Sequence, residues 1–447
     1  MSDSSVQTPY PQAKSQTASP SLSILNGRVI DPANKIDQIA DIHIQNGKIL
    51  ALGDAPENFT PQRSIDAQQK IVCPGLVDLR VRLREPGYEN KGTIATETRA
   101  AVAGGITSLC CPPDTSPIID NTAIVKLIRL KAQTEGIAKV YTLSALTQQL
   151  QGERLSEMRE LKDAGCVGTS NALFPVKNTL VMRRALEYAT SHDITVFIHA
   201  FDPWLSDGCA NEGTISTRLG LAGIPVSAET IAIARDLQLI ELTGAKAHFC
   251  QLSSARAVQL VQQAQEAGLP VTADVTAHHL HLTEMDIGFF DSNCHVIPPL
   301  RTQRDQSALH QGLKSGTISS IVSDHQPLDS DAKLAPFAET EAGISGVETL
   351  LPLALKMHDE QGMSLSDVIA SLTLQPARIL NIPEGTLNTG SDADICIFDP
   401  QCYWRVDRDT FISQGKNTPF HGWELKGKVN FTIKSGAVVF ASSDSYT

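Results

Sequence analysis

The two ends of the chain alternate hydrophobic and polar residues, which the middle of the chain does not. Residues 21–53 contain SLSILNGRVI and ADIHIQNGKILALG, and residues 393–400 and 429–440 read ADICIFDP and VNFTIKSGAVVF. This alternation is typical of strands with one buried face, and the Asn-Gly and Ser-Gly pairs are typical of the turns between such strands. We therefore expect residues 21–73 and 386–447 to meet in one small β domain.

The middle of the chain, residues 74–385, alternates short apolar runs with longer amphipathic segments. Segments such as TLVMRRALEYA and SSARAVQLVQQAQEAG place apolar residues three or four positions apart, as helices do. Repeated strand–helix pairs predict an α/β fold of the (β/α)8 TIM barrel type, with parallel strands. A doubly wound open sheet is the alternative, but no glycine-rich phosphate loop follows the first strand. The predicted strands are Leu76–Arg82, Thr107–Cys111, Lys139–Leu143, Cys166–Thr169, Thr195–His199, Lys246–Cys250, Val271–Val275 and Ser319–Asp324.

Composition narrows the class of protein. The 447 residues carry a net charge of −12, which disfavours binding to a nucleic-acid backbone. No apolar run approaches the ~18 residues that a membrane helix needs. The nine cysteines include no CxxC pair, which favours reduced thiols and a cytoplasmic location. Residues 1–20 are rich in Ser, Gln, Thr and Pro and are expected to form a disordered tail.

Charged residues occur in the first predicted barrel strand. In a (β/α)8 barrel, functional side chains lie at the carboxyl ends of the strands. Strict alternation would turn Val77, Leu79 and Val81 toward the helices. The residues that alternation then turns into the barrel are Asp78, Arg80 and Arg82. Two arginines inside a barrel are costly unless carboxylates or an anion neutralise them.

Several long motifs follow one another in a recognisable order. They are DLRVRLREPG (78–87), PPDTSPIIDN (112–121), ADVTAHHLHLTE (273–284), IPPLRT (297–302), VSDHQPL (322–328) and GISGVETLLPL (343–353). On these motifs the chain resembles the dihydroorotases of the amidohydrolase superfamily, whose first strand reads Asp-x-His-x-His-x-Arg-Glu-Pro-Gly. The resemblance extends over nearly the whole chain after residue 20. It implies a barrel whose metal centre activates water for attack on a cyclic amide.

The metal-site positions implied by the resemblance are mostly altered. Only His199 and Asp324 keep metal-binding residue types. The residues that replace the others are Arg80, Arg82, Asn171 and Gln251. Arginine is always protonated and cannot bind zinc, and a catalytic zinc usually has three protein ligands. We therefore predict that the family's metal centre is absent and that the protein carries no cofactor.

The implied substrate positions are also altered. Arg84, the family's partner for the dihydroorotate carboxylate, is present, but Asp114 replaces a nearby asparagine and would repel that carboxylate. Ile297 and Leu328 replace an asparagine and a histidine. These changes predict that dihydroorotate is not the ligand, and they leave His199, Asp324 and Arg84 as vestiges of a catalytic site.

Other polar residues could substitute for the missing ligands. Strand alternation predicts that His248 and Cys250, which precede Gln251, point away from the site. The pair His278-His279 and the residue His325 are expected to have structural roles. We instead expect the guanidiniums of Arg80 and Arg82 to occupy the vacated metal positions. There they would pair with Asp324, and Asp274 is a second candidate partner.

Three functions are compatible with this sequence. The first is a structural role, because the chain is similar to a metal-less dihydroorotase homologue that some bacteria carry as the non-catalytic subunit of aspartate transcarbamoylase. This similarity implies a hetero-oligomer with the catalytic chain of that enzyme. A homodimer of this chain is also compatible with the sequence. The second is a metal-poor amidohydrolase with altered cyclic-amide activity. The third is a protein that binds an anionic metabolite through its arginines.

Overall fold

The computed structural model describes residues 21–443, so the expected tail at residues 1–20 lies outside the described residues. Eight parallel strands form one sheet in the order β15-β14-β13-β10-β9-β8-β7-β6. The two ends of this order meet, because the Arg82 N–H donates to the His325 carbonyl (3.0 Å) and the His325 N–H donates to that of Arg80 (3.2 Å). The predicted barrel is confirmed, and the open-sheet alternative is wrong.

Each predicted barrel strand is present, with ends shifted by a few residues. Their bounds are β6 Leu76–Asp78, β7 Ile106–Cys111, β8 Lys139–Ala145, β9 Gly168–Ser170, β10 Val196–Ile198, β13 Ala247–Phe249, β14 Val271–Thr276 and β15 Ser320–Val322. A small parallel pair, β11 (Ala210–Asn211) and β12 (Gly223–Ile224), lies between β10 and β13 in the chain.

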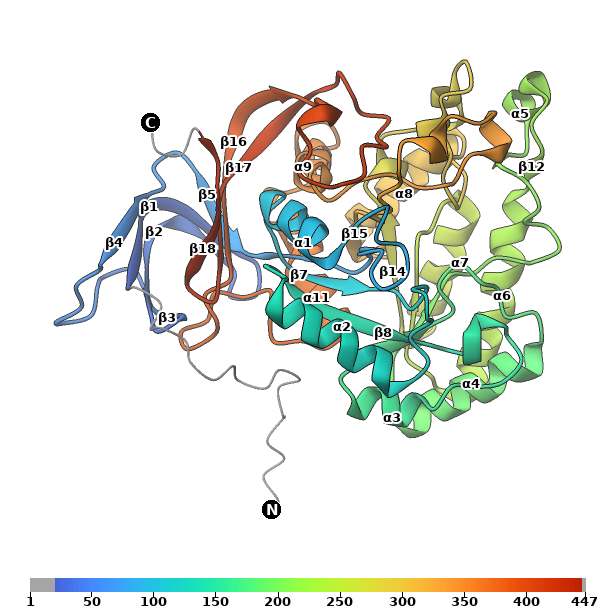
Figure 1. Cartoon of the computed structure of the whole chain (residues 1–447), viewed down its shortest axis with the longest axis horizontal. Helices are drawn as coiled ribbons and strands as arrows, with labels where there is room; N and C mark the ends of the chain where they lie inside the picture. The colour runs from blue at the N-terminus through green and yellow to red at the C-terminus, as the bar shows by residue number, and fades with distance from the viewer. Residues whose placement is uncertain (1–20, 444–447) are drawn as a thin grey trace.

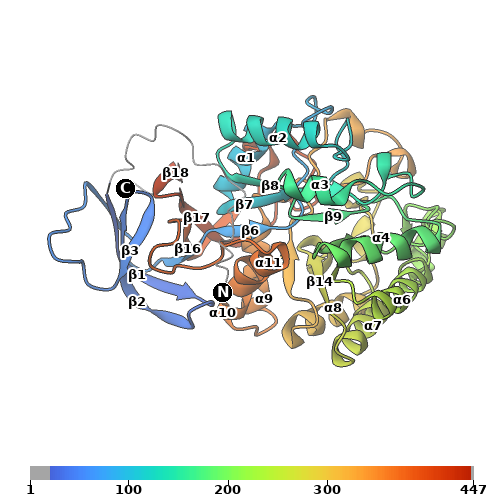
Figure 2. The same ribbon diagram turned by 90° about the horizontal axis from the view of Figure 1, so that it is seen from below.

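Helices surround the barrel on its outer face (Figures 1 and 2). Several begin at a side chain that accepts a backbone N–H, such as Thr93, Asn121 and Ser254, so capping fixes where the helices start. The helices are α1 Ile94–Ala103, α2 Thr122–Thr134, α3 Met158–Asp163, α4 Thr179–Ser191, α5 Thr214–Leu219, α6 Val226–Thr243, α7 Ala255–Glu266, α8 Gln303–Ser315, α9 Leu350–Asp359, α10 Leu365–Leu372 and α11 Leu374–Leu380. Short 3-10 turns are η1 Gln148–Leu150, η2 His278–Leu280, η3 Glu284–Ile287, η4 Ser292–Cys294, η5 Asp331–Lys333, η6 Phe337–Glu339 and η7 Arg408–Thr410.

The two ends of the chain build one mixed sheet beside the barrel (Figure 1). Its strands are β1 Leu22–Asp31, β2 Ile36–Gln45, β3 Lys48–Leu52, β4 Arg63–Asp66, β5 Ile71–Pro74, β16 Ile395–Arg405, β17 Glu424–Lys434 and β18 Ala437–Ala441. The antiparallel pair β5–β16 joins the N-terminal strands to the C-terminal strands. The sheet has its own core, in which Ile24 and Ile42 pack with Ile397 and Phe431. The expected β domain built from both ends of the chain is confirmed.

The segment between β16 and β17 reaches back to the carboxyl end of the barrel. Ser413 donates through its hydroxyl to Glu97 of α1 (2.6 Å), and Asn417 donates through its amide to the carbonyl of Gln326 (3.0 Å). Asn417 also accepts the backbone N–H of Leu328 (3.0 Å). This segment therefore fixes the loop that follows β15, where the candidate site lies.

Within residues 21–443, no helix combines the length and the apolar character that crossing a membrane requires.

Candidate functional site at the carboxyl end of the barrel

Two arginines converge on one aspartate inside the barrel. Arg80 Nε and Arg82 Nη1 each lie 3.1 Å from Asp324 Oδ1. The side chains are almost fully buried, with exposed fractions of 4% for each arginine and 2% for the aspartate. The expected pairing of both guanidiniums with Asp324 is confirmed.

Asp114 supplies the second carboxylate of this cluster. Nε and Nη2 of Arg82 both lie 2.8 Å from Asp114 Oδ2. Burial opposes ionisation of Asp114, but Arg82 and Arg80 outweigh it and hold the pKa of Asp114 below its ordinary value. Two cations and two anions therefore neutralise one another. The sequence predicts only that Asp114 repels a substrate carboxylate. Its ion pair with Arg82 could not be predicted, because the two residues lie 32 positions apart in the chain.

Two amides occupy the other oxygen of Asp324. Gln251 Nε2 donates to Asp324 Oδ2 (2.6 Å), and Gln326 Nε2 donates to the same atom (3.0 Å). Gln251 and Asp324 both have left-handed backbone conformations, with φ of 58° and 44°. Such conformations are costly for residues with a side chain, so the surrounding contacts hold the two side chains in this arrangement. Asp324 therefore accepts hydrogen bonds from Arg82, Gln251 and Gln326, and Arg80 adds an ion-pair contact without a hydrogen bond.

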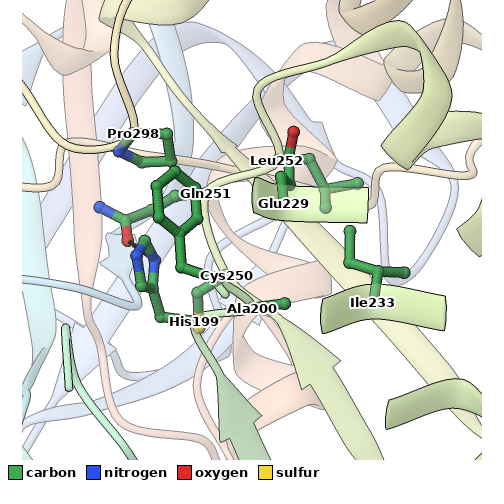
Figure 3. Close-up of a pocket in the computed structure, with 9 residues that line it drawn as sticks. His199, Ala200, Glu229, Ile233, Cys250, Gln251, Leu252 and Pro298 are labelled. Atoms are coloured by element: carbon green, nitrogen blue, oxygen red, sulfur yellow. Dashed lines mark hydrogen bonds between the residues drawn. The ribbon is translucent and has the colours of Figure 1, made fainter. Parts of the chain in front are cut away.

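His199 also joins this network. Its Nδ1 lies 3.1 Å from Gln251 Oε1. Figure 3 shows the two side chains facing each other. Burial, with help from Arg80, lowers the pKa of His199 to about 3, so the imidazole is neutral at ordinary pH. Asn171 does not face the cluster as a ligand, because its amide bonds the backbone of His199, with Nδ2 to the carbonyl (3.0 Å) and Oδ1 from the N–H (2.9 Å).

The expected alternation along the first strand is wrong for Val77 and Leu79, although Arg80 and Arg82 do turn into the barrel. Val77 and Leu79 pack in one cluster with Phe197 and Val322 of other barrel strands and with α11, whereas Val81 packs in the main core. The cause is local, because β6 ends at Asp78 and pairing resumes only at the Val81–His325 bridge. Asp78 does not pair with a guanidinium, and its Oδ1 accepts the backbone N–H groups of Arg80 (3.1 Å) and Ser323 (3.3 Å). Burial raises the pKa of Asp78 to about 7.

The expectation that His248 and Cys250 point away from the site is also wrong. His248 Nε2 lies 2.9 Å from Asp274 Oδ2, and the potential ligand atoms of His248, Cys250 and Asp274 all lie within 4.8 Å of one another. β13 ends at Phe249, and the left-handed backbone at Gln251 turns that side chain back toward the same region. His248 and Cys250 therefore lie near the site together with Gln251, an arrangement that simple strand alternation cannot predict.

The residues at the family's metal positions do not fit a metal centre, because two guanidiniums and two amides already engage Asp324. The His248, Cys250 and Asp274 group has nitrogen, sulfur and oxygen donors of the types that zinc accepts. Within this group, however, His248 Nδ1 is bonded to Thr272 (2.8 Å) and its Nε2 to Asp274. Burial raises the pKa of the Cys250 thiol, and Arg80 lies beside it. A metal ion there would displace the His248–Asp274 bond next to a fixed cation.

Two small pockets lie beside the cluster of Arg80, Arg82 and Asp324. The first includes His199, Cys250 and Gln251 (Figure 3) and has a cavity volume of about 0 Å³, and the second includes Arg82 and Arg84 and has about 10 Å³. Both are far smaller than the ~300–1,000 Å³ of ordinary ligand sites.

Arg84 donates through Nε to the Pro327 carbonyl (2.9 Å). Burial and the neighbouring Arg82 lower the pKa of Arg84 to about 10. Leu328 is buried, and Ile297 is half-buried, so neither offers a polar group to a ligand.

The remaining histidines have protein partners that suit structural roles. Both ring nitrogens of His325 are bonded, Nε2 to Glu97 (2.8 Å) and Nδ1 to the N–H of Gly346 (3.0 Å). His279 lies 2.7 Å from the Thr276 hydroxyl and 3.4 Å from the Pro299 carbonyl. His278 is different, because its Nε2 is buried without a hydrogen-bond partner among the described residues.

Comparison with known proteins identifies the family. The family model described as dihydro-orotase-like matches residues 69–257. A dihydroorotase-like protein of Pseudomonas putida is 49% identical over 418 residues, which cover 93% of this chain and 98% of that protein. The chain belongs to the dihydroorotase-like family. A protein of Pseudomonas aeruginosa with the same description is 48% identical over 93% of the chain.

Relatives named as enzymes are also similar to this family member. A dihydroorotase of Syntrophus aciditrophicus is 44% identical and covers 93% of the chain and 98% of its own length. Among solved structures, the L-hydantoinase of Arthrobacter aurescens superposes with a TM-score of 0.85 at 25% identity, covering 93% of this chain and 95% of its own. The fold is therefore that of an amidohydrolase barrel with an additional β domain.

Proposed function

We propose that this dihydroorotase-like protein lacks the family's metal centre and acts in the cytoplasm as a structural partner of the aspartate transcarbamoylase catalytic chain. In this role the barrel serves as a scaffold and does not hydrolyse cyclic amides. The proposal rests on which parts of the family pattern the chain retains. The barrel and the β domain are complete, whereas the residues at the carboxyl ends of the barrel strands are replaced.

The set of protein contacts around Asp324 is the observation that carries the proposal. A carboxylate that binds a metal or accepts a proton needs a free lone pair. Asp324 Oδ1 contacts two guanidiniums at 3.1 Å, and Oδ2 accepts two amides at 2.6 and 3.0 Å. Removing these partners to admit a metal would leave the guanidiniums of Arg80 and Arg82 buried beside a second cation. That arrangement is electrostatically unfavourable in a poorly solvated interior.

The names of the relatives also support a loss of the dihydroorotase activity. The two Pseudomonas relatives are called dihydroorotase-like proteins, and relatives at 44% identity are called dihydroorotases. This chain is therefore more similar in sequence to the relatives called dihydroorotase-like than to these two relatives called dihydroorotases. This supports a change of function within the family.

A metal-poor amidohydrolase is the second candidate, and the group His248, Cys250 and Asp274 is the observation that favours it. Three donors are the usual number of protein ligands at a catalytic zinc. In that case Cys250 would hold the metal as a thiolate, and Arg80 would stabilise a developing oxyanion.

Metal analysis and activity assays separate the two candidates. The full-length protein is purified without chelators, its zinc, manganese and iron are measured, and hydrolysis of dihydroorotate is followed. We expect less than one metal ion per chain and a rate no greater than that of buffer. One tightly bound metal per chain that Cys250→Ala removes would support the second candidate. Purification of the chain from its host, with its partners identified by mass spectrometry, tests the structural role directly.

A further inference from the structure

Two neighbouring loops at the carboxyl end of the barrel expose large apolar side chains. The first loop, residues 284–295, follows β14 and contains Met285, Phe289 and Phe290, which are 60%, 101% and 46% exposed. The second loop, residues 330–341, follows β15 and contains Leu334, which is 78% exposed. We call these four residues the apolar patch. Both loops lie at the end of the barrel near α8 in Figure 1.

The two loops are tied together by hydrogen bonds. Lys333 Nζ donates to the carbonyls of Ser292 (2.9 Å) and Glu341 (2.7 Å), and Ser292 Oγ donates to the carbonyl of Lys333 (2.8 Å). The buried ring of Phe337 lies tilted against the ring of His295, with ring centroids 5.0 Å apart. The patch is therefore held on a fixed framework and costs little ordering on binding.

The backbone of the first loop is strained where it presents the aromatic residues. Phe290 has a left-handed conformation with φ of 66°, which is an outlier for a bulky side chain. Folding alone gives no reason to hold Phe289 fully in water beside such a residue. Exposed aromatic residues on a rigid support are typical of the anchors at protein–protein interfaces.

The charges around the patch indicate what covers it. Segments 284–295 and 330–341 contain six carboxylates and a single lysine. That lysine, Lys333, is turned into the framework by its carbonyl contacts. Five of the carboxylates are exposed, namely Asp286, Asp291, Asp331, Glu339 and Glu341, and Glu341 pairs with Lys91. A second copy of this chain would bring the same acidic rim against itself, which like-charge repulsion opposes.

We propose that the apolar patch is the docking surface for the aspartate transcarbamoylase catalytic chain, which would contribute an apolar surface rimmed by lysine and arginine. This inference rests on the proposed function, because the partner is the one named there. The aromatic residues would supply most of the affinity, and the acidic rim would supply orientation and the rate of association.

The experiment measures binding of the full-length protein to the purified catalytic chain by surface plasmon resonance, with sedimentation velocity of each protein alone. The test variant is Phe289→Asp, in which a fully exposed side chain is changed and no core contact is lost. The matched control is Ile39→Asp on β2, since Ile39 is 77% exposed on the β domain. We expect binding at least about 10-fold weaker for Phe289→Asp and unchanged for Ile39→Asp. We also expect that Asp331→Lys with Glu339→Lys slows association and reduces its dependence on salt.

Each other outcome overturns a different statement. Equal binding by wild type and Phe289→Asp would show that the surface is wrong while the partner stands. No binding by the wild type would overturn the proposed function, and this docking surface with it. A wild-type dimer that Phe289→Asp dissociates would show that the patch is covered by a second copy of the chain.

Discussion

Replacing Arg82 with methionine is the most direct test of the ion-pair cluster. Methionine keeps much of the length and apolar volume of the arginine stem and removes the guanidinium. The change deletes one contact to Asp324 (3.1 Å) and the two-nitrogen contact to Asp114 (2.8 Å). Asp324 keeps Arg80, whereas Asp114 loses the guanidinium that bonds it directly.

The magnitude follows from the burial of these groups. Breaking a buried ion pair from one side costs about 3–5 kcal/mol, because the partner charge is left without compensation. The unfolding entropy of about 2.1 cal/mol/K per residue gives roughly 0.65 kcal/mol/K for a barrel of about 310 residues. We therefore expect the melting temperature of Arg82→Met to fall by about 5–8 °C.

Two further variants separate the ion pair from general effects of substitution. Adding Asp114→Asn to Arg82→Met removes the stranded charge and should recover part of the loss. Arg84→Met is the matched control, because Arg84 is half-buried and donates a hydrogen bond to the backbone carbonyl of Pro327. We expect the control to cost about 1 kcal/mol, the value of an ordinary hydrogen bond.

Differential scanning calorimetry and urea unfolding of these variants measure the effect. The double variant is decisive, because Asp114→Asn can restore stability to Arg82→Met only if the loss came from the unpaired charge of Asp114. If Asp114→Asn lowered stability further on the Arg82→Met background, the stranded-charge explanation would fail. An Arg82→Met protein as stable as the wild type would refute the cluster as a stabilising element.

Three further variants test other parts of the site. Arg80→His with Arg82→His should still hydrolyse dihydroorotate no faster than buffer in a coupled assay, because residues that act as a unit are not restored singly. Gln251→Ala removes one of the two amide donors to Asp324 Oδ2 and also removes the partner of His199 Nδ1. It should lower the free energy of unfolding by about 1–3 kcal/mol, measured in urea. Asp78→Asn tests pH dependence. Burial raises the pKa of Asp78 from 3.8 to about 7, so its contribution is complete below about pH 4 and is lost as the pH rises through 7. The stability difference between pH 5 and pH 8 should shrink by on the order of 2–3 kcal/mol in Asp78→Asn, and an unchanged pH profile would contradict the assignment.

Much of the fold follows from local pattern. Alternation at the two ends of the chain predicts the β domain, and its change to helical spacing after residue 74 predicts the barrel. Both predictions hold because each depends on which face of an element is buried, and the periodicity of the sequence records that face directly.

The site was predicted less completely, because its geometry depends on where strands end. The pairing of Arg80 with Asp324 could be expected from charge and from the carboxyl-end rule of the barrel. The positions of His248 and Cys250 could not, since β13 stops at Phe249 and a left-handed residue follows it. Alternation has no meaning beyond such a break. The bond from Arg82 to Asp114 likewise joins loops whose approach is set by the whole barrel.

The contacts of Asp324 explain why partial reversion of this site toward a metal centre is unfavourable. A buried ion pair often contributes little net stability when compared with apolar residues of the same volume. Its removal is costly in a different way, because each partner that remains is a charge without compensation. Here one carboxylate holds two guanidiniums and two amides, and one of those guanidiniums holds a second carboxylate. Removing any single member therefore strands at least one other buried group. The cluster is stable against stepwise change whatever its net contribution to folding, and this makes it a suitable core for a scaffold.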